Sequence, residues 1–267
     1  MRLALLGVRG STPAPGAEFV RYGGHTSCVA VSADGARVPR LVLDAGTGLR
    51  DLGPLLGGAA YTGSIVLTHL HWDHVQGLPF CPAVDRPDAR VEVYLPGSAG
   101  DPKHLLERGM SPPHFPIGPD GLLGAWRFLP SESREIEGFS VTVAPIVHKG
   151  GITHGIRIEA DGVAVAYLPD HAPQLGSSAA AEALAADVDL LLHDAQYLAG
   201  ERDIADAYGH PTIPDVLEFA DRCRARRLVL THHAPTRTDD ELDALAKEMI
   251  GESRLVEVAR QGTQLVV

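Results

Sequence analysis

Cysteine is scarce in this sequence, and the three cysteines that it has lie far apart. Cys28, Cys81 and Cys223 form no C-x-x-C pair, and their number is odd. A small fold held together by disulfide bonds needs paired cysteines, and so does a zinc ribbon. The sequence therefore argues against both of these classes.

Positive charge is also in short supply. The 267 residues include 23 Lys and Arg against 34 Asp and Glu, which gives a formal net charge of −11 at pH 7. A protein that holds nucleic acid through bulk charge needs the opposite balance. The composition weighs against nucleic acid as the main partner, although it leaves room for a local basic patch.

Long apolar runs are missing as well. No stretch approaches the roughly 18 consecutive apolar residues that a membrane-spanning helix needs. The apolar run at residues 3–8 is too short for a signal sequence, and Arg9 interrupts it. We therefore expect a cytoplasmic protein with no membrane partner.

Apolar residues suited to a folded core are plentiful, at 45% of the chain. Short runs that predict strands alternate with segments that predict helices, and we find neither a linker nor a repeat. The predicted strands are 3–8, 28–31, 41–43, 64–68, 91–95, 139–146, 155–159, 163–168, 189–192, 227–230 and 264–267. The predicted helices are 49–56, 179–186, 213–224 and 239–250. This pattern indicates one domain over residues 1–267.

One segment departs from the pattern. Residues 98–135 are rich in Pro, Gly and Ser, and only two stretches, near 102–109 and 119–125, predict helices. Long segments with little regular structure of their own are often lids or binding loops. We therefore expect a lid or an insertion at residues 98–135.

Histidine is unusually frequent, with 13 residues. The sharpest pattern is H-x-H-x-D-H at residues 69–74, directly after a predicted strand. Imidazole and carboxylate groups are the ligands that suit zinc and similar divalent ions. On an extended backbone His69 and His71 point to the same side, and a following turn lets Asp73 and His74 face a second point nearby. An isolated histidine is usually structural, but four donors in six positions predict a metal site.

Three further donors follow predicted strands: His148, Asp170 and His232. Polar residues at strand ends commonly gather at one edge of a layered sheet structure. Two metals roughly 3.5–4 Å apart need about six or seven ligands, preferably with one bridging carboxylate. We therefore expect two divalent metal ions, zinc or alternatively manganese, held by these three residues and the four of the motif.

The H-x-H-x-D-H pattern after an apolar strand resembles the metallo-β-lactamase fold superfamily. Residues 41–48 match its strand and Asp-x-Gly element, residues 167–170 its hairpin with the bridging aspartate, and residues 228–232 the strand that supplies the last histidine. The resemblance covers nearly the whole chain. It implies an α/β (α+β) fold, a four-layered αββα sandwich with the metals at one edge of the two sheets.

The resemblance also implies how the ligands divide between the ions. One ion takes His69, His71 and His148. The other takes Asp73, His74 and His232, and Asp170 bridges the two. Asp73 either orients the attacking water as well or serves in coordination alone.

Gly209-His210, followed by a predicted helix and a Leu-Thr-His strand end, narrows the resemblance to the ribonuclease Z and cyclic-phosphodiesterase branch. In that branch the extra histidine contacts the scissile phosphate. His210 would donate a proton to the leaving oxygen or hold a phosphate oxygen. Its alternative is a position at a helix start without substrate contact.

Two acidic residues are expected to support these groups. Asp44 would accept a hydrogen bond from a ligand imidazole and fix its tautomer. The resemblance assigns Asp194 as the partner of His210, with a strand-end cap as the alternative. We expect Trp72 to pack rather than to stack on a substrate, and His154 to be solvated or part of the lid.

The sequence thus predicts a dinuclear metallohydrolase, a phosphodiesterase that cleaves a small or cyclic phosphodiester by attack of a metal-bound hydroxide. One alternative is a tRNA 3′-processing endoribonuclease, which the net charge and the lack of a recognisable exosite arm disfavour. Others are a carboxylic ester, lactone or thioester hydrolase on the same fold, and a metal-binding module without turnover. Since dimers are common in the resembling branch, we expect a homodimer.

Overall fold

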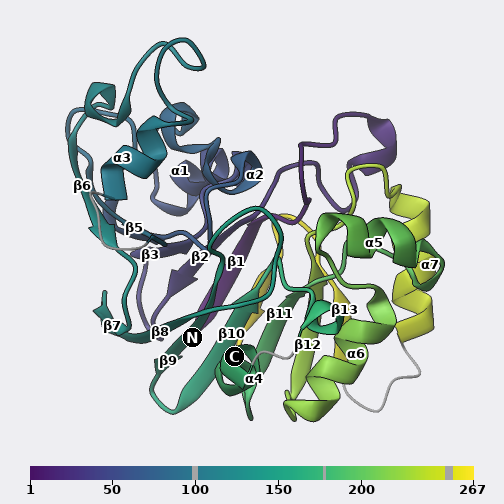
Figure 1. Cartoon of the computed structure of the whole chain (residues 1–267). Coiled ribbons are helices and arrows are strands. Elements are labelled where there is room, and N and C mark those ends of the chain that lie inside the picture. Colours follow the sequence, from purple (N-terminus) through teal and green to yellow (C-terminus); the bar gives the residue numbers. More distant parts are fainter. Residues whose placement is uncertain (98–101, 177–178, 250–254) are drawn as a thin grey trace.

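The computed structural model describes residues 1–97, 102–176, 179–249 and 255–267 of the chain. In this part of the chain, two mixed sheets of seven strands each lie between helices (Figure 1). One sheet has the order β14-β1-β2-β3-β4-β5-β6, and the other β13-β12-β11-β10-β9-β8-β7. The α/β class and the layered sandwich predicted from the sequence are confirmed.

The strands of the first sheet are β1 (Arg2–Gly7), β2 (Cys28–Ser32), β3 (Leu41–Leu43), β4 (Thr62–Val66), β5 (Arg90–Leu95), β6 (Ala125–Pro130) and β14 (Gln264–Val266). Those of the second are β7 (Arg134–Ile136), β8 (Phe139–Pro145), β9 (His154–Ala160), β10 (Val163–Leu168), β11 (Leu190–Asp194), β12 (Arg227–Thr231) and β13 (Leu255–Val258). The helices are α1 (Leu52–Leu55), α2 (Trp72–Val75), α3 (Pro102–Glu107), α4 (Ala179–Ala185), α5 (Arg202–Tyr208), α6 (Ile213–Arg222) and α7 (Asp239–Glu248).

Alternation along the strands builds the layers. In β11, Leu190 and Leu192 join the apolar core between the two sheets, together with Leu3 of β1. Leu191 between them joins a different core, which includes Phe219 of α6. Successive side chains of a strand point to opposite faces, so one continuous apolar strand packs against both the other sheet and the covering helices. Figure 1 shows α4 and α6 beside the second sheet, and α1, α2 and α3 beside the first.

The strand directions bring the polar strand ends to one edge. β10, β11 and β12 are parallel neighbours, and β8 runs the same way as β10 because both are antiparallel to β9. In the first sheet β3 and β4 are parallel. Residues that follow, or end, these strands therefore share an edge of the sandwich. They are Asp44, the segment 69–74, His148, Asp170, Asp194 and His232.

Several elements differ from the sequence prediction. The predicted helix at 49–56 is α1 preceded by a 3₁₀ turn, Thr47–Asp51. Strands β7 and β13 and helix α5 were not predicted. Helix 119–125 was wrong, since only a 3₁₀ turn at Pro119–Gly121 forms there and β6 follows. Trp126 and Phe128 flank Arg127, a short alternation typical of a strand, which the surrounding Gly and Pro residues obscure.

The segment predicted as a lid or insertion is only partly described, because residues 98–101 lie outside the described residues. The part that is described contains α3 and β6, and β6 pairs with β5 at the edge of the first sheet. Residues 125–130 thus belong to the sheet itself. Within the described ranges, no helix combines the length and the apolar character that crossing a bilayer takes.

Candidate metal centre

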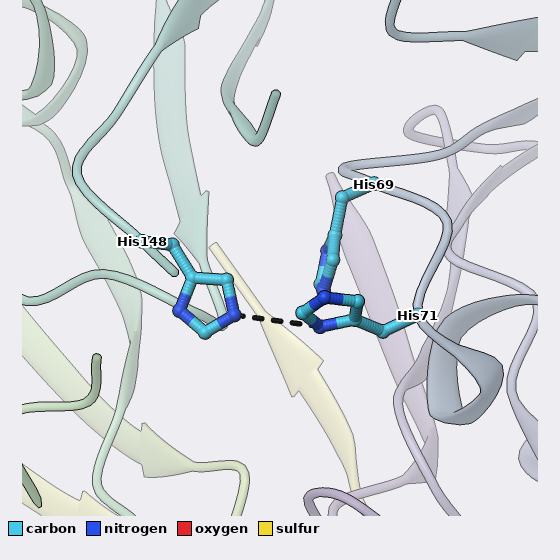
Figure 2. Close-up of side chains that lie close together, drawn as sticks. All are labelled: His69, His71 and His148. Carbon is cyan, nitrogen blue, oxygen red and sulfur yellow. Dashed lines mark hydrogen bonds between the residues drawn. The ribbon is translucent and has the colours of Figure 1, made fainter. Parts of the chain in front are cut away.

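The first cluster consists of His69, His71 and His148 (Figure 2). One ring nitrogen from each lies within 4.8 Å of the others, and His148 Nε2 is 3.4 Å from His71 Nδ1. The Nδ1–H of His148 donates to the Gly209 carbonyl at 2.8 Å. This bond leaves the lone pair on Nε2 facing the cluster, as a metal ligand requires.

The second cluster consists of Asp73, His74 and His232. Asp73 Oδ2 lies 3.2 Å from His74 Nε2 and 3.1 Å from His232 Nε2. The backbone N–H of Ser11 donates to the same oxygen at 2.7 Å. A mixed set of one carboxylate and two imidazoles is typical of zinc and similar divalent ions.

Asp170 lies between the two clusters. Its Oδ2 is 3.0 Å from His74 Nε2 and 3.3 Å from His232 Nε2. Its Oδ1 is 3.6 Å from His148 Nε2, which belongs to the other cluster. One carboxylate that reaches both clusters has the geometry of a bridging ligand.

Asp44 supports the clusters from the buried side. Its Oδ2 accepts a hydrogen bond from His74 Nδ1 at 2.7 Å and one from the Tyr167 hydroxyl at 3.0 Å, while its Oδ1 accepts one from the backbone of Thr68 at 2.8 Å. The bond to His74 fixes the tautomer whose Nε2 faces Asp170. This is the position predicted for Asp44 from the sequence.

The chemistry of these residues fits two divalent cations. Within the described chain, His69 Nε2, His74 Nε2 and Asp170 Oδ2 are buried without a hydrogen-bond partner. Burial holds the pKa of His69 well below its usual value, so the ring is neutral and offers a lone pair. Burial alone would raise the pKa of Asp73, but the nearby His74 and His232 outweigh it and lower the pKa. Buried lone pairs and carboxylates that converge on one point are costly unless a cation joins them.

His210 and Asp194 form a pair beside the clusters. His210 Nδ1 lies 2.7 Å from Asp194 Oδ2, and its ring stacks on that of His232 with centroids 5.4 Å apart. Helix α5 ends at Tyr208, and the φ of 79° at the following Gly209 reverses the chain and directs His210 toward the site. Burial lowers the pKa of His210, an effect that the charges of Asp170 and Asp73 oppose. The hydrogen bond to Asp194 occupies Nδ1 and orients the ring, so Nε2 is the nitrogen that can contact a substrate.

A cavity of about 700 Å³ opens over both clusters. Its wall includes Ser11, Gln196, Tyr197 and Tyr208, which the sequence did not identify as site residues. No chemical pattern in the sequence marked these four residues. No Lys or Arg is among the described residues that line the cavity. Any negative charge on a ligand here must be neutralised by the metals and histidines.

The structure brings together all ten residues predicted for the site, and it corrects two neighbours. Trp72 does not pack into the core, since 74% of it is exposed and it lines the cavity. His154 is buried rather than solvated. His171, beside Asp170, points away from the metal ligands and bonds His193 through Nδ1 at 2.9 Å.

Gly10 permits the close approach of His232, whose backbone has an unusual φ of 57°. A Cβ at Gly10 would lie 2.4 Å from the His232 ring. We expect Gly10→Ala to displace this ligand and to lower metal affinity and turnover about 10- to 100-fold, the range for residues that orient metal ligands. Titration with metal and steady-state kinetics measure both effects. Gly200→Ala is the matched control, because a Cβ there meets nothing within 4 Å; equal behaviour of the two variants would contradict the prediction.

Comparison with known proteins agrees with this geometry. The family model of the β-lactamase superfamily domain matches residues 39–233, which is most of the chain. A ribonuclease Z from Natronomonas pharaonis is 25% identical over 280 residues, covering 87% of this chain and 86% of that protein.

Solved structures show the same fold. A diphosphatase from the PhnP family has a TM-score of 0.73 at 18% identity, with 100% of this chain and 97% of that chain covered. The Zn²⁺-bound PqqB from Methylobacterium extorquens has a TM-score of 0.71 at 20% identity, with 100% of both chains covered. At these identities the likeness is one of fold.

Proposed function

The chain belongs to the β-lactamase superfamily, and we propose that it is a dinuclear metallohydrolase that cleaves a small or cyclic phosphodiester. The observation that carries the proposal is a single cavity that joins two metal-ligand clusters to the His210–Asp194 pair. A phosphodiester carries one negative charge, which two divalent ions can neutralise without help from Lys or Arg.

The bound metals would lower the pKa of an attacking water and neutralise charge that develops on the phosphate oxygens. The side chains of the protein orient the attacking water and transfer protons. Asp73, held by the Ser11 N–H, places a carboxylate oxygen at the cavity wall where it can orient that water. A proton shared between Asp194 Oδ2 and His210 Nδ1 leaves Nε2 to carry another toward the substrate. From Nε2 it can hold a phosphate oxygen or pass to the leaving oxygen.

Turnover of bis(p-nitrophenyl) phosphate tests the proposal. We expect p-nitrophenolate release by protein loaded with Zn²⁺ or Mn²⁺, and a fall of at least about 100-fold after chelation, because the charge stabilisation by the metals is lost. Adding either ion back to the dialysed protein should restore the rate. Undiminished turnover by protein shown to be metal-free would contradict the proposal.

An endoribonuclease of the ribonuclease Z type is the second candidate, since the curated relative of that name matches 87% of the chain. The cavity lining, however, offers no cationic side chain among the described residues to a polyanionic backbone. A panel that runs from cyclic nucleotides to a precursor tRNA, assayed on protein of known metal content, separates the two. Zinc as the native metal, the homodimer and the cytoplasmic location remain predictions.

A further inference from the structure

A second cavity, of about 350 Å³, adjoins the metal centre. It shares Leu70 and Trp72 with the cavity over the metals, so these two side chains form a common wall. Leu70 lies between the predicted ligands His69 and His71, and Trp72 begins α2. A substrate held at the metals can therefore extend into the second cavity without leaving the protein surface.

The wall of this cavity combines aliphatic side chains with three large aromatic ones, Trp72, Phe80 and Phe115. Phe80 and Phe115 meet edge to face, with centroids 5.7 Å apart, and Trp72 and Phe80 are 74% and 62% exposed. Large exposed aromatic side chains around a hollow indicate a binding surface rather than a core. They offer flat faces that favour stacking with another ring.

The cavity has few polar side chains. No Asp, Glu, Lys or Arg is among the described residues that line it. Gln76 and His114 are exposed at its wall, and the indole Nε1–H of Trp72 donates no hydrogen bond to any described residue. These groups suit the polar edge of a neutral ring and would not neutralise a charged ligand.

The position of His210 sets which part of the substrate enters. His210 follows α5, whose residues Ile204 and Tyr208 line the metal cavity together with Trp72 of α2. Figure 1 shows α5 and α2 in separate halves of the fold. In an in-line displacement the attacking oxygen lies opposite the leaving oxygen, so the group that stays on phosphorus projects to the side of that axis. If His210 faces the leaving oxygen, the retained group can reach the second cavity past Leu70 and Trp72, which line both cavities. The inference rests on the proposed function in this respect.

We propose that this second cavity, the aromatic subsite, binds a neutral planar ring on the ester group that remains on phosphorus. The ring is an aryl group or a nucleobase. Stacking against Trp72 and Phe80 then selects aromatic phosphodiesters over alkyl ones, while the metals hold the phosphate.

Three p-nitrophenyl esters that share one leaving group test the subsite: those of methyl phosphate, phenyl phosphate and thymidine 5′-phosphate. We expect kcat/KM for the phenyl or the thymidine ester to exceed that for the methyl ester about tenfold or more, from the apolar area buried. A gain for both identifies ring stacking. A gain for thymidine alone identifies a nucleobase read by Gln76 and His114.

Phe80→Ala should lower the ratio of phenyl to methyl kcat/KM toward one, mainly through KM. Because Phe80 is largely exposed, its truncation leaves the core intact. Leu123→Ala, at a similarly exposed apolar residue outside the cavity, should leave the ratio unchanged. A second readout needs no turnover: phenylphosphonate should quench Trp72 fluorescence in a Trp126→Phe background more strongly than methylphosphonate, and Phe80→Ala should weaken this quenching.

The outcomes separate the two proposals. If no ester is cleaved, the proposed function fails, and the fluorescence titration still tests the subsite. If the esters are cleaved with equal kcat/KM and Phe80→Ala changes nothing, the subsite is overturned. If Phe80→Ala halves the molar mass measured by light scattering and leaves the ratio of phenyl to methyl kcat/KM unchanged, the exposed aromatic residues of the cavity bind a second copy of the chain and not a substrate ring.

Discussion

Replacing Asp170 by alanine is expected to lower the metal content toward one ion per chain. Asp170 is the one carboxylate in the described site that reaches both clusters, 3.0 Å from His74 Nε2 and 3.6 Å from His148 Nε2. Without it, two neighbouring cations lose the anion that reduces their mutual repulsion. Turnover should fall at least about 100-fold, beyond the cost of a residue that merely orients a ligand.

Metal analysis of the dialysed protein, together with steady-state kinetics, checks this prediction. Asp170→Asn keeps the size of the side chain and removes its charge, so it should behave as the alanine variant does if bridging is the role. Asp88→Ala is the control, since the described contact of this exposed carboxylate is with Arg86. Two ions per chain in both Asp170 variants would contradict the bridging assignment.

Much of this site could be predicted because its donors are close in sequence or follow apolar strands. The motif at 69–74 follows β4, and Asp170 and His232 directly follow β10 and β12 without a long loop. The sequence thus indicated both the ligand set and the sheet edge, since parallel strands end at the same edge. Short, continuous apolar runs made those strands recognisable.

Other parts could not be predicted, for physical reasons. The aromatic subsite joins Trp72 of α2 to Phe115 of a distant loop, and no local pattern reports which distant side chains pack beside each other. Trp72 was expected to pack because aromatic residues usually do, yet α2 presents it to solvent. Strand β6 was missed because an edge strand with partly exposed residues carries a weak apolar signal.

Replacing His210 by alanine should lower kcat for phosphodiesters by about 10²- to 10⁴-fold, the usual contribution of a positioned proton donor. The metal content should stay the same, because Asp73, His74 and His232 form a three-ligand group without His210. His210 Nδ1 bonds Asp194 at 2.7 Å and lies 3.9 Å from Asp170 Oδ1, so it is committed to Asp194 rather than to an ion. Asp194→Asn should cause a smaller loss, since it disturbs the orientation of the ring but leaves the ring in place. His104→Ala, at an exposed histidine, is the control.

The leaving group distinguishes the two roles that His210 can have. A proton donor matters most when the leaving oxygen is basic, so the loss should be larger for an alkyl leaving group than for p-nitrophenolate, which departs without a proton. A residue that only holds a phosphate oxygen would lower both rates by the same factor. A loss of rate in either pattern would place His210 Nε2 at the reacting phosphate. Undiminished turnover of both esters would show that His210 has no contact with the substrate and that its bond to Asp194 serves the fold alone.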